Sequence, residues 1–127
     1  MDDPEARIDE LARRARRDRE AFVPPDDPPA PEAALTYLRE GVGPAVALYV
    51  RARTGEDLVR FDPAAFERLE DAMNTWLDLY AACYGAEIDA SFTVREAAEL
   101  LVETHDVRHV AELLTRVPDR RGASGTP

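Results

Sequence analysis

The only two histidines of this 127-residue chain, His105 and His109, stand four residues apart in the stretch ETHDVRHVAELL. On a helix, this spacing places two side chains on successive turns of one face. Two such imidazoles can share a zinc ion, and a carboxylate between them can activate a metal-bound water. The stretch therefore raises metal-dependent catalysis as a first hypothesis.

Two features of the same stretch argue against a metal site. Asp106 is shorter than the glutamate that this chemistry uses, and it stands just before an apolar helical pattern, which is typical of a helix N-cap. A cap at Asp106 leaves His105 outside the helix and off the face of His109. No third ligand stands at a suitable spacing, and Cys83 lies on an apolar seam, where a buried structural thiol is expected. We therefore predict no metal, no cofactor, no catalytic residue and no enzymatic activity.

A second hypothesis for this region is DNA binding. The segment FTVREAAELL, followed by DVRHVAELLTR, resembles a helix-turn-helix over residues 92–117. Thr93 and Glu96 form the capping box that starts the first helix, and the second helix would be the recognition helix. The alternative is a pair of packed helices that closes a bundle without touching DNA. The residues that the resemblance assigns to DNA contact are Arg95, Arg108, His109 and Arg116.

An arginine cluster near the N-terminus is the third candidate site. The segment RRARRDR holds five arginines in seven residues, within a chain whose net charge is −10. Such a cluster can bind an acidic partner or nucleic acid. The alternative is that the arginines dock on the acidic face of their own domain or pair along the helix. The candidate partner-binding residues are Arg13, Arg14, Arg16, Arg17 and Arg19.

The elements that would hold this cluster are a helix and a tether. Residues 1–22 read as a helix with a thin apolar stripe, so we predict that this helix lies outside the packed body. Residues 23–30 are rich in proline and are predicted to be an extended linker. Residues 119–127 are polar and contain glycine, which is typical of a disordered tail.

Residues 31–118 are predicted to form one mainly α-helical bundle. A helix from Pro31 to about Glu40 should end at the following glycines. The next segment favours a helix from Pro44, and the alternative is a small β-hairpin at about 46–61. Two further helices are expected from Thr93 and from Asp106.

The clearest element spans residues 62–84, with Asp62 as its cap, Pro63 at its start and Gly85 at its end. An apolar seam runs along it at helical spacing, and the opposite face carries Glu67, Asp71, Asn74 and Asp78. The seam can be buried within the chain or in an interface. Its residues are Phe66, Leu69, Met73, Trp76, Tyr80 and Cys83.

Composition suggests a habitat. The chain has 26 acidic residues and 16 basic ones, all of them arginine, and it lacks lysine and glutamine. This composition resembles that of small acidic cytoplasmic proteins of halophilic archaea, a group without an assigned activity. The resemblance implies molar salt, in which the Debye length falls to about 3 Å, so net charge says little about partners.

The sequence also gives an expectation for where the protein is located and what it does. No apolar run approaches the ~20 residues that a membrane span needs, and the start shows no secretory signal. We therefore expect a cytoplasmic protein with no membrane contact. The predicted function is a non-enzymatic protein-interaction or regulatory module, with an unknown protein partner or self-association. The alternative is a DNA-binding transcriptional regulator that uses residues 93–117, which makes nucleic acid the alternative partner.

Overall fold

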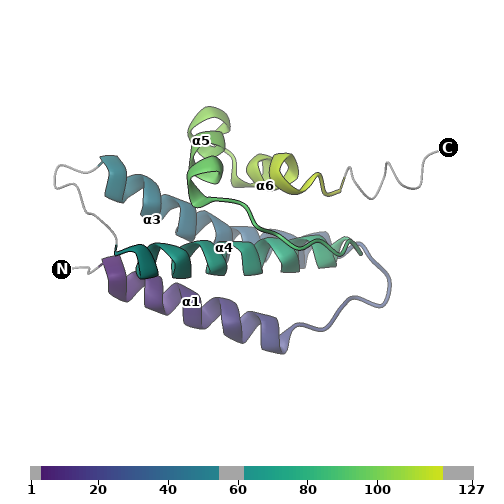
Figure 1. The fold of residues 1–127 in the computed structure, drawn as a ribbon. Helices are drawn as coiled ribbons and strands as arrows, with labels where there is room; N and C mark the ends of the chain where they lie inside the picture. The colour runs from purple at the N-terminus through teal and green to yellow at the C-terminus, as the bar shows by residue number, and fades with distance from the viewer. Residues whose placement is uncertain (1–3, 55–61, 119–127) are drawn as a thin grey trace.

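The computed structural model describes residues 4–54 and 62–118 of the chain. These ranges are mainly helical and contain no strand, so the prediction of a mainly α fold is confirmed (Figure 1). Residues 46–54 belong to a helix, which excludes the hairpin alternative there, and residues 55–61 lie outside the described ranges. The elements are α1 (Pro4–Ala21), α2 (Pro31–Tyr37), a π-helix (Leu38–Val42), α3 (Gly43–Thr54), α4 (Pro63–Cys83), α5 (Val94–Thr104) and α6 (Val107–Thr115).

Helix α4 is the centre of the fold, and α1 and α3 lie on either side of it in Figure 1. Its start is fixed as predicted, because the Asp62 carboxylate accepts a hydrogen bond from the backbone N–H of Ala64 at 3.2 Å. Its end is fixed by Gly85, which adopts a positive φ of 78°. The apolar seam of α4 is buried within the chain, with Trp76 fully inaccessible to solvent and Phe66 half-buried.

Helix α1 is not an outlying arm, and that prediction is wrong. Ile8, Leu11 and Ala15 are at most 2% exposed and belong to the same core as α4. The stripe is thin in sequence, but a polar contact with α4 reinforces it. The indole Nε1 of Trp76 donates a hydrogen bond to the Asp18 carboxylate at 2.8 Å. The thin apolar stripe of α1, together with the hydrogen bond from the Trp76 indole, therefore holds this helix against α4.

The proline-rich segment brings the chain back to α4. The backbone N–H of Ala30, which immediately precedes α2, donates a hydrogen bond to the Cys83 carbonyl at 2.7 Å. Near the start of this segment, the Phe22 ring packs against Tyr37 of α2, with ring centroids 6.2 Å apart. The segment therefore links α1 to the body through contacts at both of its ends.

The glycines after α2 do not end the helix as predicted. The chain continues through the π-helix into α3, and Gly41 lies in this π-helix. A Cβ atom built on Gly41 would lie 2.2 Å from the Trp76 ring, so only glycine lets the two helices approach this closely. The carbonyl of neighbouring Glu40 accepts a hydrogen bond from Arg14 Nη2 at 2.8 Å. Gly41 thus acts as a contact point between helices.

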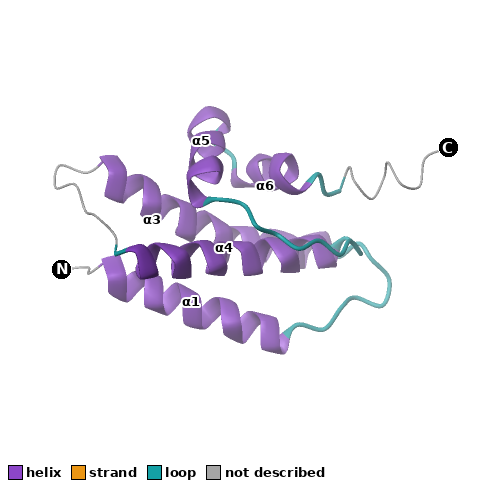
Figure 2. Ribbon diagram, in the orientation of Figure 1, coloured by secondary structure: helices purple, strands orange, loops and turns teal. Residues whose placement is uncertain are grey.

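The extended segment before α5 runs along part of the polar face of α4 (Figure 2), whereas Glu67 and Asp71 of this face stay exposed. Asn74 accepts from the backbone N–H of Phe92 and donates to the Phe92 carbonyl, both at 2.9 Å. Asp78 accepts from the Ala90 N–H at 2.8 Å, and Glu70 accepts from the Val94 N–H at 3.1 Å. Four residues of a helix rise about 6 Å, and two residues of an extended chain span about 6.6 Å. Every fourth side chain of α4 therefore lies opposite every second peptide group of the extended segment.

The last two helices start as predicted. Thr93 and Glu96 form a reciprocal capping box on α5, and the Asp106 carboxylate caps α6 by accepting from the Arg108 N–H at 3.0 Å. Between them, His105 ends α5 with a φ of 58°, in the left-handed region that glycine usually occupies. In the described part of the chain, no helix is long and apolar enough to cross a membrane.

Candidate functional site

The outer side of α1 carries three exposed arginines, Arg13, Arg16 and Arg17, which we call the arginine face. None of the three makes a hydrogen bond or ion pair with another described residue. Asp9, one turn before Arg13, is instead bonded to Arg68 of α4 at 3.0 Å. Glu20 follows Arg16 by one turn, but no ion pair joins it to the arginine face, so the three guanidinium groups stay unpaired among the described residues.

The other two arginines of the cluster turn toward the body. The guanidinium of Arg14 lies 5.9 Å from the centre of the Trp76 ring, a cation–π distance, while its Nη2 bonds the Glu40 carbonyl. Arg19 forms an ion pair with Asp78 of α4 at 3.3 Å. The five predicted partner-binding residues thus divide into two that hold α1 in place and three that face solvent.

An open groove lies between the end of α1, helix α4 and the segment 85–92. One part, of about 760 Å³, has apolar walls that include Phe22, Ala82 and Ile88. A second part, of about 490 Å³, has acidic walls, and the two parts share the Arg19–Asp78 pair. No signal in the sequence indicated this groove, since it depends on how the segment 85–92 lies along α4.

Asp78 is the polar junction of this groove. Burial raises the pKa of Asp78, and the nearby charge of Asp89 raises it further. The hydrogen bond from Ala90 and the charge of Arg19 oppose this shift without cancelling it. Asp78 therefore ties α1 and the segment before α5 to α4, and its carboxylate holds a proton more strongly than an exposed aspartate does.

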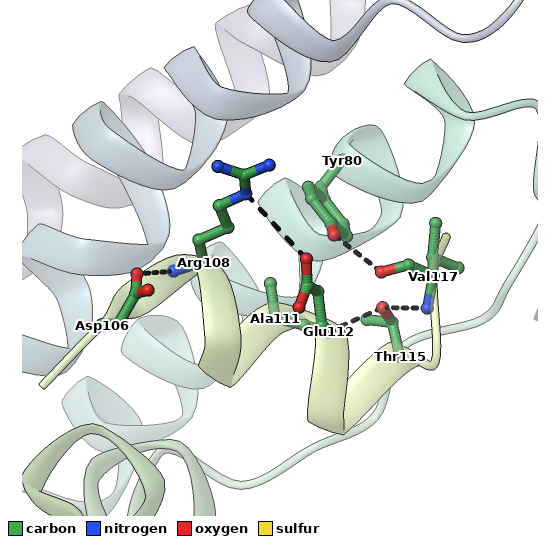
Figure 3. A network of polar contacts seen from close by, with 7 residues as sticks. All are labelled: Tyr80, Asp106, Arg108, Ala111, Glu112, Thr115 and Val117. Atoms are coloured by element: carbon green, nitrogen blue, oxygen red, sulfur yellow. Dashed lines mark hydrogen bonds and ion pairs between the residues drawn. The ribbon is translucent and has the colours of Figure 1, made fainter. Parts of the chain in front are cut away.

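The four residues that the helix-turn-helix resemblance assigns to DNA are all exposed: Arg95, Arg108, His109 and Arg116. They share this end of the molecule with the exposed acids Glu96, Glu99 and Glu103 of α5. Arg108 also lies 3.9 Å from Glu112 on its own helix (Figure 3). The surface formed by α5 and α6 is therefore mixed in charge.

The histidines lie in different structural settings. His105 ends α5, whereas His109 lies inside α6, so the two do not share one helical face. Among residues 4–54 and 62–118, no group of three or more histidine, cysteine, aspartate or glutamate side chains is arranged to hold a metal ion. Cys83 is buried, and burial raises the pKa of its thiol, which keeps it protonated and unreactive at neutral pH.

Comparison with known proteins identifies a family. Residues 2–119 match the model of the family described as Domain of unknown function (DUF8055). This match covers most of the chain, which therefore belongs to that family. No curated protein and no solved structure matches the chain.

Proposed function

We propose that this DUF8055 member is a non-enzymatic protein-interaction module that binds an acidic surface of a partner protein through its arginine face. The observation that carries this proposal is the environment of Arg13, Arg16 and Arg17. They are exposed on one side of α1 and without an ion pair among the described residues, in a chain whose net charge is −10. A positive face on so acidic a protein is best matched by a partner's carboxylates.

The packing of α1 supports the proposal. Because Leu11 and Ala15 are buried against α4, the helix is already fixed before a partner arrives. Binding then orders only the arginine side chains, which lowers the entropic cost of association. Guanidinium groups also form two-pronged hydrogen bonds with carboxylates, which adds geometric specificity.

We propose that the module works in the cytoplasm of a halophile, which restricts the kind of contact. With a Debye length near 3 Å at about 1 M salt, long-range attraction contributes little. The arginines must then touch carboxylates directly, within hydrogen-bond distance. A partner with a complementary acidic surface meets this condition, whereas one with a merely negative net charge does not.

The test is affinity capture from a halophile lysate in molar KCl, with half of the sample treated with nuclease. The variant Arg13→Gln/Arg16→Gln/Arg17→Gln removes the arginine face. Its control, Arg39→Gln/Arg51→Gln/Arg95→Gln, removes the same charge from exposed positions elsewhere. We expect one stoichiometric protein to bind wild type and control, to survive nuclease and to be lost from the first variant. Equal capture by all three proteins would contradict the proposal.

The partner of the arginine face can also be a second copy of this chain. Sedimentation of the purified protein in molar KCl measures the mass of any assembly. A dimer that the arginine-face variant abolishes would make a second copy the partner. A monomer would leave a different protein as the partner.

The second candidate function is DNA binding by α5 and α6. It is favoured by the exposure of His109 and Arg116, neither of which bonds to another described residue through its side chain. The measurement is the shift of a DNA duplex on a gel over a range of salt concentrations. A shift that Arg108→Ala/Arg116→Ala abolishes, and that the arginine-face variant leaves intact, would make the regulator the primary function.

A further inference from the structure

A small pocket lies where α2, α4 and α6 meet, away from the arginine face. It is partly open to solvent, has a volume of about 140 Å³ and is lined mainly by apolar atoms. Leu35 of α2 and Leu38 of the π-helix line it, together with Tyr80 of α4 and Tyr84, which directly follows α4. A cavity of about 150 Å³ with apolar walls accepts one benzene ring, so this pocket matches a single aromatic ring in size.

The aromatic wall is suited to stacking. The rings of Tyr80 and Tyr84 are tilted by 60° with centroids 5.4 Å apart. The Tyr80 hydroxyl donates a hydrogen bond to the Val117 carbonyl at 2.7 Å, which fixes that ring in position. The Thr115 hydroxyl in turn accepts a hydrogen bond from the Val117 N–H at 3.1 Å (Figure 3). This bond fixes Val117, whose carbonyl is the partner of Tyr80. A ring placed against this wall gains edge-to-face or offset contacts.

One cation lines the pocket, namely Arg108 of α6. Its backbone N–H is fixed by the Asp106 cap, and its Nε lies at the long distance of 3.9 Å from Glu112 (Figure 3). Its two terminal nitrogens bond to no other described residue. Arg108 therefore presents unused donors beside an apolar, ring-sized hole.

We infer that this pocket binds a small aromatic carboxylate, with its ring between the leucines and tyrosines and its carboxylate on the terminal nitrogens of Arg108. Paired N–H donors recognise a carboxylate through two parallel hydrogen bonds. Glu32 also lines the pocket. Its negative charge opposes a carboxylate and so directs that group toward Arg108. The proposal is independent of the arginine face.

The experiment is a calorimetric titration of the full chain with phenylacetate and, separately, with its neutral isostere phenylacetamide. We expect phenylacetate to bind in the millimolar to micromolar range that so small a ligand permits. We also expect it to bind about tenfold more tightly than the amide, as a charge-assisted pair predicts.

Two substitutions should act in opposite directions. Arg108→Gln should remove the tenfold preference, whereas Glu32→Gln should strengthen phenylacetate binding about twofold to fivefold by removing a repulsive charge. The control Arg116→Gln removes the same charge from another exposed position of the α6 region and should leave binding unchanged. Leu35→Trp, which fills the pocket, should abolish binding while the helical circular dichroism signal is retained.

Three results would overturn the proposal. The first is the absence of heat and of chemical-shift changes with phenylacetate. The second is equal affinity for the carboxylate and the amide in the wild-type protein. The third is retention of the preference in Arg108→Gln. The arginine-face variant should bind phenylacetate like wild type, so a failure of the proposed function and a failure of this site can be told apart.

Discussion

Helices α1 and α6 both present arginines to solvent, but their surroundings give those arginines different chemistry. On α1, the inner arginines contact α4 and the π-helix, and the outer ones form no ion pair with another described residue. On α6, Arg108 lies beside Glu112 and lines a pocket with two tyrosines. An isolated positive face suits a large acidic partner, whereas one guanidinium beside an apolar hole suits a small anion. The lesson is that burial and neighbours, rather than residue type, decide what an arginine can bind.

The substitution Leu11→Ala is the strongest test of the claim that α1 is a fixed part of the body. Leu11 is fully buried, so removing its side chain should leave a cavity and lower the free energy of unfolding by about 4 kcal/mol. Urea unfolding, followed by Trp76 fluorescence, measures the change. The control Arg17→Ala, on the exposed side of the same helix, should stay within about 0.5 kcal/mol of wild type. An α1 that is only tethered would give no difference between the two variants.

Gly41→Ala tests how closely the π-helix approaches α4. The added methyl group would lie 2.2 Å from the Trp76 ring, so the helices must separate, at a cost of about 3 kcal/mol. Thermal unfolding measures the loss. Gly43→Ala is the matched control, because its added methyl would lie 3.0 Å from the Leu38 carbonyl and should cost less. Equal losses in the two variants would contradict the close contact with Trp76.

Asn74→Ala tests whether α1 and the α5–α6 end are held to α4 independently, because Asn74 fixes the segment before α5 to α4. Two hydrogen bonds to Phe92 are lost, which should cost about 2 kcal/mol. Hydrogen exchange should speed up in the segment before α5 and stay unchanged in α1. Glu67→Ala, on the exposed side of α4, serves as the control. Faster exchange in α1 would mean that the two regions are not separately held.

The smallest expected effect concerns pH. Burial raises the pKa of Asp78, so the folded protein holds this proton more strongly than the unfolded chain. Stability from this group is therefore present at low pH and falls as pH rises from the ordinary aspartate range through the raised value. Asp78→Asn keeps an oxygen acceptor for Ala90 and removes this slope. Unfolding midpoints of wild type and variant are measured from acidic to neutral pH. As pH rises, the stability of wild type relative to Asp78→Asn should fall. Parallel curves would show that Asp78 does not titrate in this window.

Local signals in the sequence predicted the helices well. Asp62, Thr93 and Asp106 each cap the helix that they precede, because a cap depends only on residues within one turn. The α4 seam was also readable, since its period is that of a helix. The exposure of Arg13, Arg16 and Arg17 was not settled by the sequence, which left docking on the body open for all five arginines.

The features that the sequence did not reveal depend on contacts between distant residues. Trp76 and Asp18 are 58 positions apart, and their hydrogen bond is part of what places α1 in the core. The helical spacing places Asn74 opposite the apolar seam, but it does not reveal the hydrogen bond to Phe92, 18 positions later. His105 takes a left-handed conformation that residue type alone would assign to glycine. Each case requires knowledge of the tertiary arrangement, which periodicity and capping do not provide.

Arginine-directed covalent footprinting of the captured complex tests directly whether the partner binds the arginine face. The reagent modifies exposed guanidinium groups, and mass spectrometry compares each site in the free and the bound protein. We predict protection of Arg13, Arg16 and Arg17, with Arg39, Arg51 and Arg116 modified as in the free chain. Protection of Arg116 and Arg95, with the arginine face left open, would contradict this prediction and would place the partner on α5 and α6.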